Sequence, residues 1–90
     1  MSGAGARWTN EAWADYLRWR EVNRKIFDRI NRLVQLIESD PFRGIGKPEP
    51  LRHELAGCWS RRITEEHRLV YKMTGKTAHI ISCRYRYKNK

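Results

Sequence analysis

The stretch CWSRRITEEHRLVYKM, residues 58–73, marks a change in the hydrophobic period of the chain from helical spacing to strict alternation. In its first half, Trp59, Arg61 and Ile63 fall on one face of an extended segment, because side chains alternate along a strand. The second half alternates in the same way, and the two adjacent glutamates between the halves can turn the chain. The stretch therefore predicts an antiparallel β-hairpin.

The segments on either side of this hairpin have contrasting patterns. Residues 77–85, TAHIISCRY, follow a Thr-Gly-Lys turn and predict a third strand, which makes a meander. Residues 41–53, PFRGIGKPEPLRH, contain three prolines and two glycines, which argue against regular structure. Because Phe42, Ile45 and Leu51 are apolar anchors, we expect an ordered loop that lies on the domain.

Two helices are predicted before this loop. A short strand at residues 6–8 precedes the first helix, which begins at Thr9 or Asn10 as its N-cap and runs to about Glu21. Its apolar face is expected to consist of Trp13, Tyr16 and Leu17.

The second helix is predicted from the cap residue Asn23 to just before Asp40-Pro41, because a residue that precedes proline disfavours the α region. Its apolar stripe has helical spacing and consists of Ile26, Ile30, Leu33 and Ile37. The predicted fold class is therefore α+β, with an N-terminal helical hairpin packed on the apolar face of a twisted antiparallel sheet.

Length and charge limit the possible functions. The 90 residues suffice for one domain with one small core, which we expect at residues 7–87, between a flexible leader at 1–6 and a basic tail at 88–90. Nineteen lysines and arginines against 10 aspartates and glutamates give a net charge of +9, which favours a polyanionic partner. RNA, DNA, an acidic protein and an anionic membrane surface all satisfy this requirement.

The expected location is the cytoplasm. No stretch approaches the ~20 apolar residues of a membrane span, and the first residues lack the apolar core of a signal peptide. Cys58 and Cys83 are expected to be reduced thiols, since nothing around them has the spacing of a metal site. We expect neither a metal ion nor a cofactor.

Basic, acidic and aromatic residues suited to phosphodiester chemistry gather around the predicted sheet. Arg62 and Arg68 lie on neighbouring strands near a turn. A carboxylate can take the proton of a ribose 2′-OH, guanidinium groups can stabilise charge on the phosphate, and aromatic rings can hold a base, all without a metal ion. The remaining candidates come from the loop and from the end of the last strand: Glu49, Arg52, His53, Arg84, Tyr85, Arg86 and Tyr87.

Each candidate also has a structural explanation. Glu49 lies between two prolines, where a solvated loop charge is common, and His53 stands alone. The arginines can form a solvated face, and the tyrosines can be packing residues. The residues by themselves therefore indicate a basic α+β domain that binds RNA, with RNase activity as a more specific alternative.

A longer motif carries a family resemblance. KPEPLRHELAGCWSRRITEEHRLVY, residues 47–71, resembles the YoeB-type toxins of the RelE superfamily, and the similarity includes WTNEAWADYLRW at 8–19, DPF at 40–42 and CRY at 83–85. The resemblance implies a RelE or microbial RNase-like fold and cleavage of mRNA in the ribosomal A site. It also implies inhibition by a YefM-type antitoxin, and homodimers are common in such families.

The resemblance assigns roles to individual residues. Glu49, in PEPL, matches the general base, and Arg68, in EEHRLVY, matches the arginine that stabilises the transition state. Arg52 stands where the family has a basic residue that contacts phosphate. The other matches are two active-site positions in SRRITEE and a tyrosine placed against the substrate base: Arg62, Glu66 and Tyr87.

The chain departs from the family at residue 86. Members of the family end in CRYHY, with the histidine as general acid, whereas this chain has CRYRY. Arg86 holds a phosphate well but donates a proton poorly at neutral pH. The substitution is either natural or a deliberate attenuation of a toxic protein.

Three functions are compatible with this departure. The first is a ribosome-dependent endoribonuclease, fully active or weakened at residue 86. The second is a non-cleaving toxin that binds only the ribosome and the antitoxin. The third, a relative that poisons another target such as DNA gyrase, is disfavoured because Glu49, Arg52 and Arg68 are all present.

Overall fold

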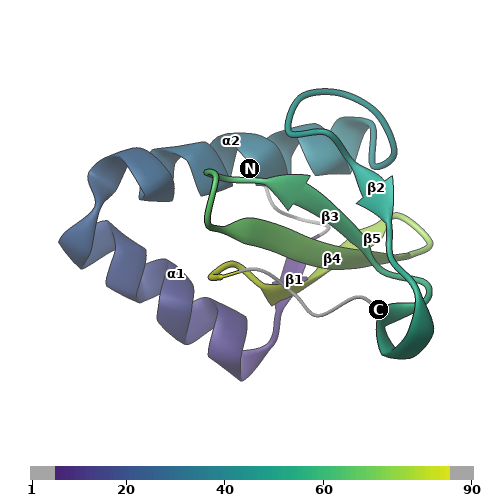
Figure 1. Ribbon diagram of the computed structural model, residues 1–90, viewed down its shortest axis with the longest axis horizontal. Helices are drawn as coiled ribbons and strands as arrows, with labels where there is room; N and C mark the ends of the chain where they lie inside the picture. Colours follow the sequence, from purple (N-terminus) through teal and green to yellow (C-terminus); the bar gives the residue numbers. More distant parts are fainter. Residues whose placement is uncertain (1–5, 86–90) are drawn as a thin grey trace.

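The computed structural model describes residues 6–85, which form a helical layer and a sheet layer (Figure 1). The predicted leader, apart from Ala6, and the predicted tail lie outside these residues. Neither helix is long and apolar enough to cross a membrane. The elements are β1 (Ala6–Trp8), α1 (Asn10–Val22), α2 (Arg24–Ser39), β2 (Glu49–Pro50), a 3-10 helix η1 (His53–Leu55), β3 (Trp59–Arg62), β4 (Arg68–Thr74) and β5 (Thr77–Ser82).

Local capping signals determine where both helices begin. The Thr9 side chain accepts a hydrogen bond from the Ala12 amide at 3.0 Å, so Thr9 rather than Asn10 is the N-cap of α1. Asn23 caps α2 in the same way through the Ile26 amide, and it also terminates α1. This single shared residue explains the short link of the helical hairpin.

The sheet has the order β1-β5-β4-β3-β2. The predicted meander of β3, β4 and β5 is confirmed, with Arg62 opposite Arg68 and Thr74 opposite Thr77. The short strand β1 is also confirmed, but it pairs in parallel with β5. The two helices carry the chain across one face of the sheet between β1 and the meander, which permits this parallel direction.

Two predicted boundaries differ from the structure. Residues 49–50 form an edge strand inside the segment 41–53 that was predicted to be irregular, and η1 begins at the last residue of that segment. Proline is tolerated there because an edge strand leaves its outer side unpaired. The last strand was predicted over 77–85 but ends at Ser82, beyond a register shift opposite Val70 and Tyr71.

The main core lies between the helices and one face of the sheet. The predicted α2 stripe is buried and joins Leu69, Tyr71 and Ile80. The predicted α1 face is confirmed at Tyr16, which packs against the core, but it is wrong at Trp13, which is 46% exposed, and it omitted the buried residue Ala12. Trp19, seven residues after Ala12, also packs against the core and was not predicted to do so.

A second, smaller apolar cluster covers part of the opposite sheet face. The segment that contains η1 places Leu51 and Cys58 against Val70, with Leu55 and Ile81 beside them. Figure 1 shows η1 at the end of the molecule away from the α1–α2 link. The part of this face near the β3–β4 turn lies outside the cluster and carries polar side chains.

Arg61 holds the loop between α2 and β2 from inside the core. Its side chain is fully buried, and its guanidinium donates to the carbonyls of Asp40, Arg43 and Ile45 at 2.6, 2.6 and 3.2 Å. Its Nε also donates to the Tyr71 hydroxyl, which donates in turn to the Pro41 carbonyl at 2.6 Å. The loop is therefore anchored through its backbone.

The loop was expected to be anchored by its apolar side chains, and this was only partly correct. Leu51 is buried, but Phe42 and Ile45 are both about half exposed. Gly46 completes the anchoring, because a Cβ there would lie 3.1 Å from the Arg61 Cβ and its φ is +88°. Its carbonyl accepts from the Arg62 amide at 2.6 Å, which brings the loop onto β3.

Cys83 makes the stability of the fold sensitive to alkaline pH. Burial, with the Asp15 carboxylate as a smaller cause, raises the pKa of this thiol from 9.0 to about 12. Above about pH 9 the unfolded chain loses the thiol proton while the folded chain keeps it. Deprotonation therefore favours the unfolded chain, and the stability of the fold decreases as pH rises. We expect the free energy of unfolding to fall by up to about 1.4 kcal/mol per pH unit in this range.

Urea unfolding between about pH 8 and 11 measures this slope, with Cys83→Ala as the comparison. The free energy of unfolding of the variant is expected to depend less steeply on pH. Part of the dependence should remain, because burial also raises the pKa of Tyr71. Equal slopes in the two proteins would show that Cys83 does not cause the effect.

Candidate RNA-cleavage site on the open sheet face

The register places four polar residues on the outward sheet face. Glu49 pairs with Ser60 across β2 and β3, and Arg62 pairs with Arg68 across β3 and β4. Directly paired residues point to the same face, and residues two apart in a strand share that face. Because Trp59, Arg61 and Ile63 point inward to the core, the residues that alternate with them and their partners form an outward set, here called the open face: Glu49, Ser60, Arg62 and Arg68.

Two positive charges lie side by side on this face. Cβ atoms of directly opposite residues in antiparallel strands are ~5 Å apart, and like charges in such a pair repel. Arg62 and Arg68 therefore form a pair that an anion would stabilise. Glu49 on β2 is paired with Ser60, so it lies diagonally opposite Arg62 on β3, at roughly 7–8 Å between the backbones.

The Arg68 guanidinium is held in place by the turn before it. The residue is 8% exposed, and its Nη1 donates to the carbonyls of Thr64, Glu65 and His67 at 2.6, 3.1 and 3.1 Å. Among the described residues, all its side-chain hydrogen bonds start from Nη1. The charge is thus fixed relative to the β3–β4 turn. The guanidinium group is planar and rigid, so Nε and Nη2 of Arg68 point in other directions than Nη1.

Arg62 and Glu66 complete the end of the face at the β3–β4 turn. Both are exposed, and the Arg62 carbonyl accepts from Arg29 Nη2 at 3.4 Å, which joins β3 to α2. The Glu66 amide donates to the Thr64 hydroxyl, so the turn is closed by its own side chain. The structure thus brings Arg62, Glu66 and Arg68 together.

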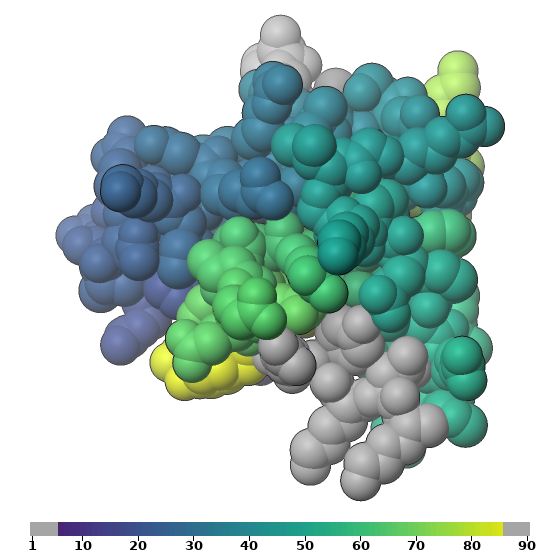
Figure 2. All heavy atoms as spheres, turned by 45° about the horizontal axis from the view of Figure 1, so that its top comes forward, coloured from purple at the N-terminus to yellow at the C-terminus, as the bar shows by residue number. Residues whose placement is uncertain are grey.

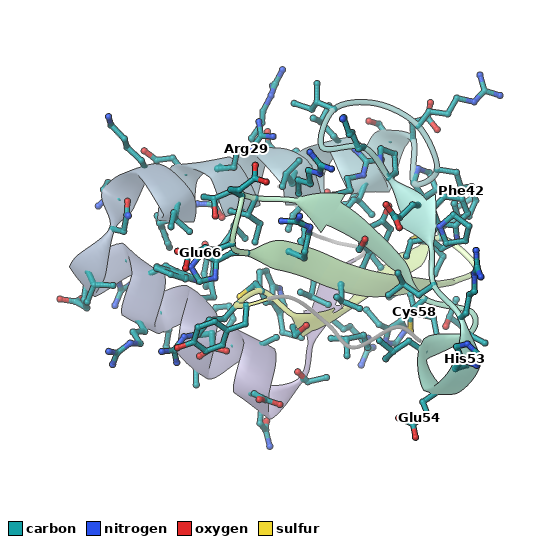
Figure 3. The ribbon with its side chains drawn as sticks, viewed as in Figure 1. Arg29, Phe42, His53, Glu54, Cys58 and Glu66 are labelled. Atoms are coloured by element: carbon teal, nitrogen blue, oxygen red, sulfur yellow. The ribbon has the colours of Figure 1, made fainter. Side chains whose placement is uncertain are left out.

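Arg52 and His53 lie elsewhere. They follow β2 at the end of the sheet that is farthest from the turn, and Figure 3 shows His53 and Glu66 at opposite ends of the sheet. Both are exposed. Of the predicted RNA-contact residues, Arg62 and Glu66 therefore lie at the turn end of the sheet, and Arg52 and His53 lie at the opposite end.

Arg84 is engaged with protein groups. Its Nη1 lies 3.7 Å from Asp15 Oδ1 of α1, and its Nη2 donates to the Tyr85 hydroxyl at 2.8 Å. The guanidinium also lies over the Tyr85 ring. Its role as an RNA contact stays a prediction, because an RNA phosphate would compete with these two partners.

The described chain ends beside the arginine pair. The Arg68 amide donates to the Tyr85 carbonyl at 3.1 Å, and the Tyr85 amide donates to His67 Nδ1 at 2.8 Å. Figure 2 shows the last described residues, in yellow, against the green β3–β4 turn. The predicted catalytic residues Arg86 and Tyr87 lie outside the described residues.

No group of three or more potential metal ligands comes together between residues 6 and 85. What the open face offers is a carboxylate and two guanidinium groups on one surface. A carboxylate suits proton abstraction, and paired guanidinium groups suit a phosphate. The arrangement therefore fits binding and cleavage of a phosphodiester.

Two residues that organise this site were not predicted from the sequence. Arg61 lay on the same alternating face as Trp59 and Ile63, and an arginine at an inward position requires buried acceptors. His67 had no comparable signal, because its acceptor role depends on where residue 85 returns to the sheet.

Comparison with known proteins agrees with this arrangement. Residues 8–87 match the family described as YoeB-like toxin of bacterial type II toxin–antitoxin system. The toxin YoeB of Escherichia coli (strain K12) is 54% identical over 80 residues, which cover 89% of this chain and 95% of that protein.

Solved structures of relatives have the same fold. A YoeB–YefM complex from Staphylococcus aureus matches with a TM-score of 0.86 and 40% identity, over 91% of this chain and 95% of that chain. A YoeB dimer from the same organism matches with a TM-score of 0.87 and 37% identity, over 96% and 100% of the two chains. The chain therefore belongs to the YoeB-like toxins of bacterial type II toxin–antitoxin systems.

Proposed function

We propose that this toxin is a ribosome-dependent endoribonuclease that cleaves mRNA in the A site and blocks translation. The observation that carries the proposal is the shared face of Glu49 and the Arg62–Arg68 pair. Family membership supports it, since the relatives are toxins of the same type. The ribosome, as the source of the substrate, would place the toxin in the cytoplasm.

The proposed reaction uses the 2′-OH of the mRNA as the nucleophile. Glu49 takes the 2′-OH proton, the 2′ oxygen bonds to the adjacent phosphorus, and the bond from phosphorus to the 5′ oxygen breaks. The leaving oxygen takes up a proton, and the products are a 2′,3′-cyclic phosphate and a 5′-OH end. None of these steps requires a metal ion.

The basic residues act on the phosphate. Arg68 stabilises the charge that develops on the phosphate oxygens, because its position is fixed before substrate binds. Arg62 and Arg52 hold flanking phosphates, with Glu66 at the Arg62 end of the sheet and His53 next to Arg52. Tyr87 stacks against a base in this proposal, as aromatic residues do in other RNA sites.

Arg86 is the weak point of the proposed mechanism. It stays protonated at neutral pH and can hold a phosphate, but it donates a proton poorly to the leaving 5′ oxygen. This observation also favours the second candidate, a toxin that binds the ribosome and antitoxin without cleavage. The two candidates differ in whether mRNA on translating ribosomes is cut.

Arg86→His is expected to raise the cleavage rate by about 10²-fold, the lower end of what a general acid contributes. The gain should be larger at about pH 6.5 than at about pH 8.5, because the introduced imidazole must be protonated. Primer extension on translating ribosomes maps and quantifies the cut.

Arg18→His, which adds an imidazole on the exposed side of α1, is the matched control and should give no gain. Equal rates for Arg86→His and the original chain would refute the missing-acid assignment. Absence of ribosome-dependent cleavage in both would refute the nuclease proposal and leave the binding function.

We also propose two protein partners. A YefM-type antitoxin is supported by the S. aureus YoeB–YefM complex, and a homodimer by the YoeB dimer of that organism. Trp13 supports self-association, because this half-exposed indole contacts Trp8 and Tyr16 in an aromatic cluster at the surface.

A further inference from the structure

Tyr85 has a backbone conformation that a tyrosine adopts only when its surroundings impose it. Its φ is +59°, in the left-handed region, and its side chain is more than half exposed. Two hydrogen bonds hold the residue on both sides of its Cα: its carbonyl accepts from the Arg68 amide, and its amide donates to His67 Nδ1.

The His67 imidazole does here what a backbone carbonyl does in a sheet. The ladder between β4 and β5 ends with Ser82 opposite Val70, so residue 85 lies beyond the strand. The side-chain nitrogen of His67 supplies the acceptor that the ladder would have supplied. The tyrosine backbone is thus paired with the start of β4, next to Arg68.

The His67 imidazole is packed against Trp19 of α1. His67 is buried, and its ring meets the Trp19 ring edge-on at 4.8 Å between centroids. The same indole donates from Nε1 to the Cys83 carbonyl at 2.9 Å, two residues before Tyr85. One aromatic residue of α1 therefore orients both the imidazole and the chain that approaches it.

We infer that His67 is a positioning residue that fixes the point, beside Arg68, from which the chain continues into Arg86 and Tyr87. The inference rests on the proposed function, because its value to the protein lies in the roles that this function assigns to Arg86 and Tyr87. The acceptor nitrogen performs this role, and the ring contributes packing.

Two substitutions separate the acceptor from the ring. His67→Asn keeps an acceptor oxygen near the position of Nδ1 but loses ring contacts, whereas His67→Phe keeps the ring and loses the acceptor. We expect kcat for ribosome-dependent cleavage to fall about two- to tenfold in His67→Phe and less in His67→Asn, with KM unchanged. Thermal stability should follow the opposite order, because the ring packs against Trp19.

Coupling to the last residues gives a second readout. If His67 acts through the C-terminal segment, His67→Phe should cost less in a Tyr87→Phe background than in the original chain. Additive effects would contradict the inference, as would a kcat of His67→Phe equal to that of the unmodified chain. If kcat and thermal stability fall in the same order in His67→Phe and His67→Asn, the residue has only a packing role.

Hydrogen exchange at the Tyr85 amide tests the contact without any cleavage. The amide should be protected in the original chain and in His67→Asn, and its exchange should be about two- to tenfold faster in His67→Phe. An unprotected Tyr85 amide in the original chain would overturn the inference even if the toxin cleaves mRNA. Protection of this amide with no cleavage by either the original chain or Arg86→His would instead leave the positioning contact intact and refute the proposed nuclease function.

Discussion

Glu49→Gln is expected to lower the rate of mRNA cleavage on the ribosome by about 10³-fold, within the range that a general base contributes. The amide is nearly isosteric with the carboxylate but cannot accept the 2′-OH proton. Binding should change little, because the open face keeps both of its arginines. Single-turnover cleavage, together with sedimentation of the toxin with ribosomes, separates the two effects.

Glu54→Gln provides the matched control for this substitution. Glu54 is an exposed glutamate of η1 that points away from the sheet (Figure 3), and its replacement should leave both measurements unchanged. If Glu49→Gln cleaves as fast as the unmodified toxin, the carboxylate is not the base. If it loses ribosome binding to the same extent as cleavage, Glu49 acts in binding.

Arg61→Met is expected to destabilise the fold by about 3–5 kcal/mol, because several buried acceptors each lose a charged donor at a cost of about 1–3 kcal/mol. The methionine fills much of the volume but leaves the carbonyls of Asp40, Arg43 and Ile45 without their buried donor. Urea unfolding measures the change. Because the same loop leads to Glu49, cleavage should fall as well at temperatures where the variant is still folded.

Two further variants calibrate this prediction. Tyr71→Phe removes one hydroxyl of the network and should cost about 1–2 kcal/mol. Arg32→Met, at an exposed arginine of α2, should change stability by less than about 0.5 kcal/mol. A loss for Arg61→Met no larger than for Arg32→Met would mean that the loop carbonyls find solvent and that Arg61 does not hold the loop.

Features with a local cause could be predicted from the sequence. The N-caps at Thr9 and Asn23 and the end of α2 before Asp40-Pro41 depend on neighbouring residues, and all three agree with the structure. The hairpin of β3 and β4 follows from alternation over consecutive residues. The α1 face was predicted only in part, at Tyr16, because several aromatic residues compete for the core there and tertiary packing selects among them.

The site was predictable in its residues but only partly in its geometry. Alternation placed Arg62 beside Arg68, whereas the role of Glu49 came from the family motif. That Glu49 shares their face could not be predicted, because β2 has two residues, one of them proline, and exists only through pairing with β3. Its position therefore depends on the loop that Arg61 anchors, which no local pattern reveals.

The parallel pairing of β1 with β5 has a consequence for how the toxin is synthesised. Ala6 pairs with Ala78, so the first strand of this sheet to leave the ribosome pairs with the last strand of the same sheet. Such distant pairing forms late, because closing a long chain costs entropy before any contact repays it. A nascent chain therefore cannot assemble the complete sheet while its last strand is still being made. Formation of the complete sheet is thereby delayed until β5 has left the ribosome.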